Sequence, residues 1–167
     1  MADILRAQNI EAYLKWPNDL LAPTSSVMAK LGGVLVEVRG DASGPCQVVI
    51  GVGVNIRLSD AAAAHISQPV ATLQQLAPQV SRNTLVSSMI EAHLQLLDGF
   101  EGSGFEAWRE RWNDYHLYKG RTVQIFQGKT VHEGVAEGVD GAGNLIVEID
   151  GAHKTFAGGE VSLRGQP

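Results

Sequence analysis

Two lysines stand beside apolar, strand-like runs near the start of the chain. Lys15 begins the run KWPNDL at residues 15–20, and Lys30 begins the run KLGGVLVE at residues 30–37. A short polar loop, residues 22–29, separates them. Two positive charges at strand ends that face one loop suit an anionic ligand with a carboxylate or a phosphate. The alternative is that both lysines are ordinary, solvated strand-end charges.

Two adjacent glycines follow the second lysine. Gly32 and Gly33 carry no side chains, so the backbone there can approach a ligand closely. A kink in the strand explains the same pair equally well.

Charge and hydropathy exclude several classes of protein. The 167 residues carry a net charge of −5 with no cluster of lysine or arginine, which argues against sequence-independent DNA binding. No apolar run approaches the roughly 18 residues needed to span a bilayer. The N-terminus lacks the apolar region of a signal peptide, so a cytoplasmic protein is expected.

Cysteine and histidine usage gives no metal site. The single cysteine, Cys46, excludes an internal disulfide framework and a multi-cysteine zinc site. The five histidines are scattered, and none pairs with cysteine or aspartate at metal-ligand spacing. Metal ligands therefore stay unknown.

Periodicity divides the chain into a mixed first part and an all-β second part. Helices are expected at 1–8 and 71–76, from an N-cap among residues 81–84 to residue 100, and at 105–112. A strand is expected at 10–16, and strands at 31–39 and 47–56 form a hairpin around a turn at 40–45. Near-continuous apolarity at residues 48–54 predicts burial on both faces.

Short strands with turn residues between them fill the end of the chain. The expected strands are 122–126, 129–137, 144–149, 153–156 and 160–163. Asp150-Gly151 is typical of a type I′ hairpin turn, which needs positive φ at both central residues. Five such strands describe a small barrel of SH3-like size, with a domain boundary near residues 114–119.

The motifs also resemble a known family. In order, residues 15–19 (KWPND), 30–35 (KLGGVL) and 51–55 (GVGVN) resemble three motifs of the bacterial biotin protein ligases. Residues 158–164 (GGEVSLR) resemble the end of that family's small C-terminal barrel. The resemblance runs from residue 1 to residue 164. It is to the second half of the catalytic domain plus the C-terminal domain.

The resemblance implies an α+β fold in two domains. A mixed-sheet fragment of a catalytic domain that is similar to class II synthetases is expected over residues 1–114. An SH3-like β-barrel is expected over residues 115–167. The implied activity is ATP-dependent: biotin and ATP form biotinyl-adenylate, and biotin passes to a lysine of a biotin carboxyl carrier domain. ATP is expected with Mg²⁺.

Site residues follow from the same motifs. Lys30 and Lys15 are expected to be catalytic through their charge, which would stabilise the negative charge that develops at the α-phosphorus. Lys30 would also contact the biotin carboxylate. The expected biotin-binding residues are Lys30, Gly32 and Gly33, and the expected ATP-binding residues are Lys15, Asn18 and Asn55.

The residue types of several side chains fit more than one role. An amide suits an adenine edge because it both donates and accepts, but Asn55 also fits a turn at a strand end. Trp16 is expected to be structural, an apolar plug beside the loop. Asp19 would orient Lys15, help to hold magnesium or serve in a turn.

Parts of the family pattern are missing from this sequence. The Arg/Gly-rich loop, roughly GRGRxG, which closes over the adenylate does not occur, nor do the strand that lines the biotin ring or a helix-turn-helix. The resemblance therefore implies a truncated ligase with weak or no activity alone and without nucleic-acid binding. The exposed sheet edge predicts homo-oligomers or aggregates.

Two other functions remain. A lipoate–protein ligase also has an Asn-Asp turn followed by a ligand-binding lysine, although the residue pair 16–17, the GVGVN motif and the barrel end favour biotin. A non-catalytic remnant would use its barrel only to dock a partner.

Overall fold

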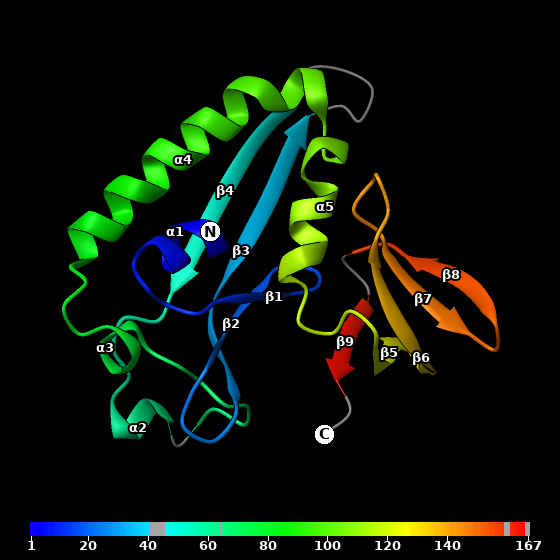
Figure 1. Ribbon diagram of the computed structural model, residues 1–167, viewed down its shortest axis with the longest axis horizontal. Coiled ribbons are helices and arrows are strands. Elements are labelled where there is room, and N and C mark those ends of the chain that lie inside the picture. The colour runs from blue at the N-terminus through cyan, green and yellow to red at the C-terminus, as the bar shows by residue number, and fades with distance from the viewer. Residues whose placement is uncertain (41–45, 64, 159–160, 166–167) are drawn as a thin grey trace. The chain divides into compact units, whose positions relative to one another are not determined.

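The computed structural model describes residues 1–40, 46–63, 65–158 and 161–165, and Figure 1 shows its elements. Contacts divide the chain into two units, which we describe separately. The first unit comprises Met1–Ala12 and Asn18–Leu85. The second unit comprises Tyr13–Pro17 and Val86–Pro167.

Parts of two predicted features lie outside the described residues. Most of the turn at 40–45 does so, as do Gly159 and Glu160 of the tail motif. In the described part of the chain, no helix is both long enough and apolar enough to cross a membrane.

An antiparallel sheet lies at the centre of the first unit. Strand β2 (Asp19–Pro23) pairs with β3 (Met28–Gly40), and β3 pairs with β4 (Cys46–Val54). Both long strands are rich in β-branched residues, which suit a pleated surface. The predicted hairpin is therefore confirmed.

The first unit also contains three short helices. They are α1 (Ala2–Ala7), α2 (Asp60–Ala63) and α3 (Leu73–Leu76). Thr72 and Gln75 form a capping box at α3: the Gln75 backbone N–H donates to Thr72 Oγ1 at 3.3 Å, and the Thr72 N–H donates to Gln75 Oε1 at 3.1 Å. The fully buried leucines of this unit are Leu5, Leu20, Leu31, Leu73 and Leu85.

The far end of the β3–β4 hairpin contradicts the predicted burial. The sequence predicts that β4 is buried on both faces, but Val48 and Val49 are about half exposed, and Val38 opposite Val48 is 63% exposed. An apolar pattern indicates which side chains favour burial, but it does not show whether another part of the protein covers them. In the described residues, no further strand pairs with β4, which ends the sheet.

The second unit contains a five-stranded antiparallel sheet. The strands are β5 (Arg121–Gln127), β6 (Thr130–Val139), β7 (Leu145–Ile149), β8 (Ala152–Phe156) and β9 (Val161–Gly165). Their order is β8-β7-β6-β5-β9. All five lie where the sequence predicts them.

A tight turn joins β7 to β8 as predicted. Asp150 has φ of 54° and Gly151 has φ of 76°. Positive φ at both positions is what a type I′ turn requires, so the Asp-Gly pair sets this hairpin.

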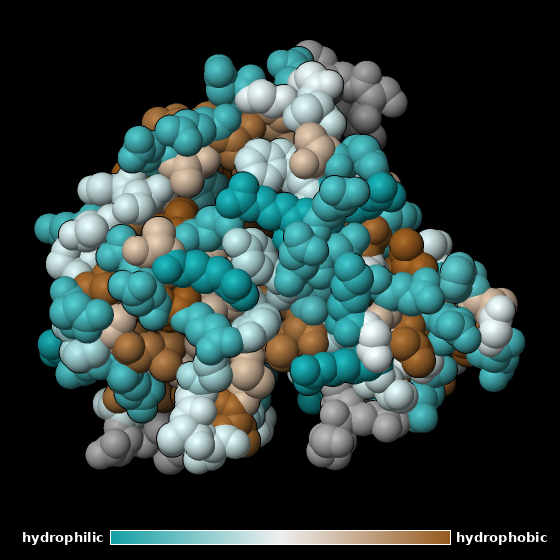
Figure 2. Space-filling model, in the orientation of Figure 1, coloured by the Kyte–Doolittle hydropathy of each residue, from teal (hydrophilic) through white to brown (hydrophobic). Residues whose placement is uncertain are grey.

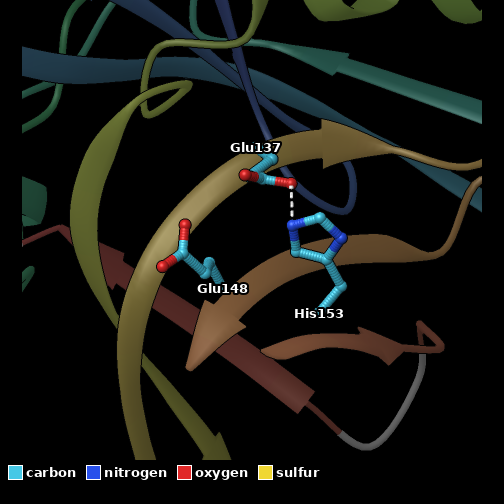
Figure 3. Close-up of side chains that lie close together, drawn as sticks. All are labelled: Glu137, Glu148 and His153. Atoms are coloured by element: carbon cyan, nitrogen blue, oxygen red, sulfur yellow. Dashed lines mark ion pairs between the residues drawn. The ribbon is translucent and has the colours of Figure 1, made fainter. Parts of the chain in front are cut away.

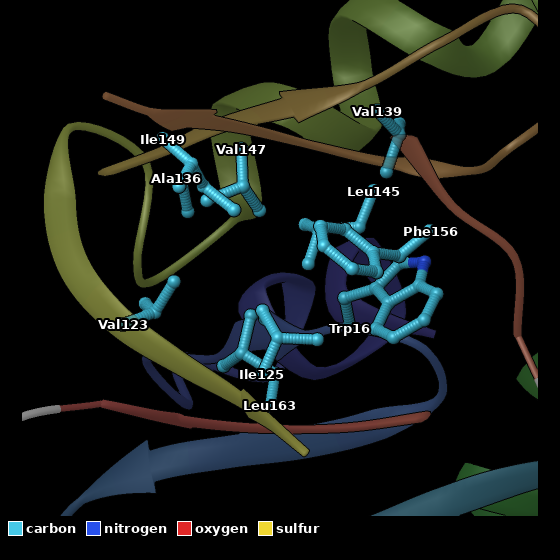
Figure 4. Packing of buried hydrophobic residues seen from close by; sticks show 10 residues of the cluster. All are labelled: Trp16, Val123, Ile125, Ala136, Val139, Leu145, Val147, Ile149, Phe156 and Leu163. Carbon is cyan, nitrogen blue, oxygen red and sulfur yellow. The ribbon is translucent and has the colours of Figure 1, made fainter. Parts of the chain in front are cut away.

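Alternating apolar residues of these strands form one core, drawn in Figure 4. Val123, Ile125, Leu145 and Val147 have no exposed surface. Trp16 joins this cluster from the other end of the chain and is buried, so its predicted role as an apolar structural residue is confirmed. Its indole Nε1–H donates to the Gly143 carbonyl at 3.1 Å, so the one polar atom of the ring is satisfied.

Three other elements belong wholly or mostly to the second unit. Strand β1 (Tyr13–Lys15) is shorter than the predicted strand at 10–16. Helix α4 (Arg82–Ser103) begins in the first unit and continues into the second, and α5 (Glu106–Tyr115) matches the predicted helix at 105–112. The Ser81 hydroxyl caps α4 by accepting from the Thr84 N–H at 3.1 Å, as the sequence predicts.

Helix α4 exposes an apolar stripe. Its exposed members are Val86, Ile90, Leu94, Leu97 and Phe100. Figure 2 shows hydrophobic atoms that reach the surface along this helix, among largely hydrophilic neighbours. Helix α4 and the β3–β4 hairpin therefore have the same property: periodicity that favours burial, on surfaces that stay uncovered.

His116 follows α5, and its buried imidazole makes no hydrogen bond among the described residues. It is 5% exposed, and neither ring nitrogen has a partner. Its ring centroid lies 4.8 Å from that of Trp112. Burial, and secondarily the charge of Lys119, lower the pKa of His116 from 6.5 to about 4, so the imidazole is neutral near pH 7.

Candidate ligand-binding site

Lys30 and Asp19 form an ion pair in the first unit. Lys30 Nζ lies 2.5 Å from Asp19 Oδ1, with the side chains 33% and 17% exposed. The charge of Lys30 is thus held in place yet still reaches solvent. The sequence did not predict this pair, and the roles predicted for Asp19 beside Lys15, with magnesium or in a turn stay predictions.

An irregularity in strand pairing places Lys30 on this face. Gly32 pairs with Leu20, but Lys30 pairs with Leu21, so β3 carries one extra residue at Leu31. Without that bulge, side-chain alternation would place residues 30 and 33 on opposite faces. With it, Lys30 shares the face of Asp19 and Gly33.

Gly33 keeps space open at the ion pair. A Cβ atom at this position would lie 3.2 Å from the Asn18 carbonyl oxygen, 3.5 Å from Asp19 Oδ1 and 3.8 Å from Lys30 Cε. Any larger side chain would therefore crowd the lysine. A glycine is therefore needed at position 33 because the backbone there passes close to the charged pair.

A glycine is needed at position 32 for a different reason. A Cβ atom there would collide with the carbonyl oxygen of Gly53 on the paired strand. Gly32 itself is buried. Its absent side chain lets β3 and β4 pack closely, and this is a packing requirement of the hairpin.

Asn18 joins the start of β2 to β3. Its side-chain Nδ2 donates to the Val34 carbonyl at 2.8 Å, and the Val34 N–H donates to the Asn18 carbonyl at 2.9 Å. The side chain is exposed, so one amide proton and the amide oxygen still face solvent.

An open hollow adjoins these residues. It has a volume of about 480 Å³. Its lining residues are Asn18, Asp19, Lys30, Gly33, Val34, Leu35, Gly51, Val52 and Gly53. One cation, one carboxylate and one amide therefore meet an otherwise apolar or glycine surface, which suits an anion attached to a less polar group.

Asn55 holds three segments together. Its side-chain Nδ2 donates to the Lys30 carbonyl at 3.0 Å and to the Ala71 carbonyl at 3.4 Å. Its backbone N–H donates to the Leu31 carbonyl at 2.8 Å. Both amide protons are thus used within the protein, and Asn55 fixes the backbone on which Lys30 stands.

Lys15 does not line the hollow. It ends β1, is half-buried and belongs to the second unit, whereas Lys30, Asp19, Asn18 and Gly33 belong to the first. The hollow therefore gathers four of the residues considered from the sequence, and Lys15 is not among its lining residues.

Sequence reasoning missed two glycines. Gly51 and Gly53 line the hollow on β4, where the GVGVN motif contributes bare backbone. The signal was their spacing: residues two apart in a strand share a face. Pairing of Gly53 with Gly33 then follows from the hairpin register.

Three possible metal ligands converge on the second unit's sheet. Figure 3 shows Glu137, Glu148 and His153, whose ligand atoms lie within 4.8 Å of one another. His153 Nε2 is 3.0 Å from Glu137 Oε2, an ion pair when the imidazole is protonated. Glu148 and His153 are exposed, and cross-strand neighbours of opposite charge are ordinary on a sheet surface, so we assign no metal.

Two family models match the chain on either side of its middle. The model described as the biotin/lipoate A/B protein ligase family matches residues 2–55, and the model described as the biotin protein ligase C-terminal domain matches residues 119–164. The bifunctional ligase/repressor BirA of Escherichia coli is 34% identical over 165 residues, which are 98% of this chain and 50% of that protein. This chain belongs to the biotin protein ligase family. The resemblance noted in the motifs is confirmed.

The chain spans only about half of the BirA proteins that it matches. The biotin–[acetyl-CoA-carboxylase] ligase of Paracoccus denitrificans is 26% identical over 155 residues, which are 91% of this chain and 63% of that protein.

Solved structures show the same fold. A biotin protein ligase from Aquifex aeolicus matches with a TM-score of 0.80 at 22% identity, over 99% of this chain and 70% of that one. The same ligase in complex with biotin and ATP matches with a TM-score of 0.79 at 21% identity. The predicted α+β class with an SH3-like C-terminal part is thus confirmed. The division at residue 114 stays a prediction.

Proposed function

We propose that this chain carries part of the site of an ATP-dependent biotin–protein ligase. The observation that supports this most directly is that Lys30, which is ion-paired with Asp19, lines a hollow together with three glycines. It lies in the segment, residues 2–55, that the ligase family model matches. A named relative that ligates biotin to acetyl-CoA carboxylase supports the same reaction.

The reaction has two steps with different demands. A biotin carboxylate oxygen attacks the α-phosphorus of ATP, and the bond to pyrophosphate breaks. The acceptor lysine amine then attacks the acyl carbon of the biotinyl-adenylate, and AMP leaves. Negative charge at the α-phosphorus is greatest in the first step, so a fixed cation there favours the transition state.

Lys30 is the residue proposed for that role. Its Nζ would contact the biotin carboxylate and the α-phosphate, with Asp19 holding the ammonium group in place until ligand arrives. Lys15 would add a second cation on the phosphate side. Both lysines are thus proposed to be catalytic through charge.

The remaining residues would position the ligands. Gly33 would let biotin approach the backbone, and Gly32 would act beside it through close strand packing. Asn18 and Asn55 would face the nucleotide. The bonds that Asn55 makes to Lys30 and Ala71 favour an indirect contribution, because its amide oxygen is the atom left to accept a ligand bond.

Further expectations belong to the same proposal. Mg²⁺ would accompany ATP, a biotin carboxyl carrier domain would be the acceptor, and the cytoplasm would be the compartment. Nucleic-acid binding is not expected, and self-association through the uncovered hairpin is. Turnover by these 167 residues alone should be weak, because no GRGRxG-type motif occurs among them.

Ligand binding tests the proposal without requiring turnover. A non-transferable biotinyl-adenylate analogue is titrated into the purified chain and its Lys30→Ala variant by calorimetry. We expect the variant to bind about 10- to 100-fold more weakly, since hydrogen bonds to charged groups contribute about 1.5–3 kcal/mol. Lys129→Ala, at an exposed lysine of the second unit, is the matched control and should bind normally.

Two results would contradict this assignment. Equal binding by Lys30→Ala and the parent chain would remove Lys30 from the site. Tighter binding of a lipoyl-adenylate analogue than of the biotinyl compound would favour the lipoate ligase alternative, which the joint biotin/lipoate description of one family model keeps open.

A further inference from the structure

Beyond the end of β4, residues 69–71 bond to the backbone of Lys30. Strand β4 pairs with β3 from Gly32 to the tip of the hairpin, so it does not reach Lys30. The Lys30 N–H donates to the Pro69 carbonyl at 2.9 Å, and the Ala71 N–H donates to the Lys30 carbonyl at 3.0 Å. Both backbone groups of the ion-paired lysine are therefore bonded to one distant segment of the same unit.

These bonds adjoin the bulge that decides the face of Lys30. The extra residue of β3 is Leu31, and its carbonyl accepts the Asn55 N–H at 2.8 Å. The Asn55 side chain donates in turn to the Lys30 and Ala71 carbonyls. A change of register by one residue moves a side chain to the other face of a sheet. The contacts that hold this bulge therefore also hold the Lys30 ammonium on the face of the hollow.

A helix cap fixes the end of this segment. Thr72 follows it directly, is 3% exposed and is the N-cap of α3. Gln75 Oε1 accepts from the Thr72 N–H at 3.1 Å and from the Thr72 hydroxyl at 3.0 Å, and Thr72 Oγ1 accepts from the Gln75 N–H at 3.3 Å. Helix α3 has only 4 residues. So short a helix has few internal bonds, and its start depends on the cap.

We propose that Thr72 and Gln75 are positioning residues for Lys30. Their cap holds residues 69–71, this segment holds the backbone at the bulge, and the bulge directs the Lys30 ammonium to Asp19 and the hollow. Neither Thr72 nor Gln75 lines the hollow, so both act through the lysine. The inference rests on the proposed function for the identity of the ligand that Lys30 meets.

Gln75→Ala is the variant that tests this role. The Gln75 side chain is exposed, so its removal takes away the reciprocal bonds of the cap and leaves the buried core intact. Gln74→Ala is the matched control, because it removes the same type of side chain from the neighbouring exposed position. Gln75→Glu should restore the parent behaviour, since glutamate also completes a capping box.

Amide hydrogen exchange measured by NMR tests the backbone contact without any ligand. In Gln75→Ala, the Lys30 and Ala71 amides should exchange about three- to tenfold faster, because loss of a cap makes local opening easier. The Val34 amide, which donates to a different partner at the start of β2, should keep its rate. Gln74→Ala should leave all three rates unchanged.

Two further measurements follow the Lys30 side chain. Its Cε–Hε NMR signal, assigned by its loss in Lys30→Ala, should shift in Gln75→Ala in the direction in which Asp19→Asn shifts it, because both changes loosen the ion pair. Gln75→Ala should also bind the biotinyl-adenylate analogue about three- to tenfold more weakly. In the Lys30→Ala background, Gln75→Ala should lower the affinity no further, because the two residues act as one unit.

Any of three results would overturn the proposal. Unchanged Lys30 exchange in Gln75→Ala would separate the cap from the lysine, and equal acceleration at Val34 would mean general destabilisation. An equal loss of affinity with and without Lys30 would give the cap a role of its own. Faster Lys30 exchange and a shifted side-chain signal in a chain that binds no analogue would support the positioning role and count against the proposed ligase function.

Discussion

The second unit's sheet and the β3–β4 hairpin are built from the same kind of sequence but differ in what they bury. In the sheet, apolar residues such as Val123, Ile125 and Val147 alternate along the strands and have no exposed surface. In the hairpin, Val36 and Val38 alternate in the same way and stay more than half exposed. The difference lies in the neighbours: the first residues belong to a core shared by five strands, Trp16 and α5, whereas Val36 and Val38 pair only with β4 among the described residues.

This difference teaches where stability and binding reside. A closed apolar cluster makes the second unit cohesive, so substitutions there should lower the free energy of unfolding. The open hairpin gains little in the isolated chain from its apolar side chains, so substitutions there should alter association with little effect on folding.

The largest expected effect breaks the closed cluster. Trp16→Ala would remove the ring that lies among the sheet's core residues and should lower the free energy of unfolding by about 3–5 kcal/mol. Val38→Ala, at the exposed hairpin, should change it by less than about 0.5 kcal/mol. Urea denaturation measures both values. Comparable losses in the two variants would mean that the hairpin is also buried in solution.

Acid should weaken the second unit through His116. Its folded pKa of about 4 lies below the unfolded value near 6.5, so the unfolded chain binds the proton first as pH falls. The neutral ring's contribution is fully present above pH 6.5 and is lost down to about pH 4, up to about 3 kcal/mol. Urea denaturation across this range follows the loss.

His116→Phe is the control for the acid effect. Phenylalanine keeps an aromatic ring against Trp112 and cannot take up a proton. The variant should therefore lose less stability than the parent chain between pH 6.5 and pH 4. Identical pH dependence in the two proteins would assign the effect to other groups.

The smallest expected effect compares two glycines of the hairpin itself. Gly32→Ala would force a methyl group against the Gly53 carbonyl and should destabilise the first unit by about 1–3 kcal/mol. Gly53→Ala would place its Cβ 3.9 Å from the Gly33 carbonyl oxygen, an ordinary contact, and should be nearly neutral. Thermal denaturation separates the two. Equal effects would show that the strands can move apart at Gly32 without cost.

Sequence reasoning predicted elements well where the determinants are local. The five strands of the second unit, the positive-φ Asp150-Gly151 turn and the capped start of α4 all follow from neighbouring residues. Family motifs likewise predicted the fold class, because they carry information beyond local preference.

Contacts distant in sequence were not predictable in this way. The Trp16 indole reaches Gly143, 127 residues away, and nothing near Trp16 indicates that partner. The Lys30–Asp19 pair depends on one extra residue at Leu31, which changes the face that Lys30 occupies. The exposure of Val48 and Val49 on β4 depends on which elements pack against the strand, and its own residues do not specify them. In each case the prediction failed for a contact between distant residues, because local sequence specifies a helix or strand but not what packs against it.

The KWPND motif is divided between the two units, and this constrains how ligases of this kind can be recombined. Trp16 belongs to the C-terminal core, whereas Asn18 and Asp19, two and three residues later, belong to the ligand-side sheet. A chimera joined near residue 114 would combine a C-terminal part from one parent with the tryptophan that must fit it from another. Exchange of that part between homologues therefore requires residues 13–17 to travel with it.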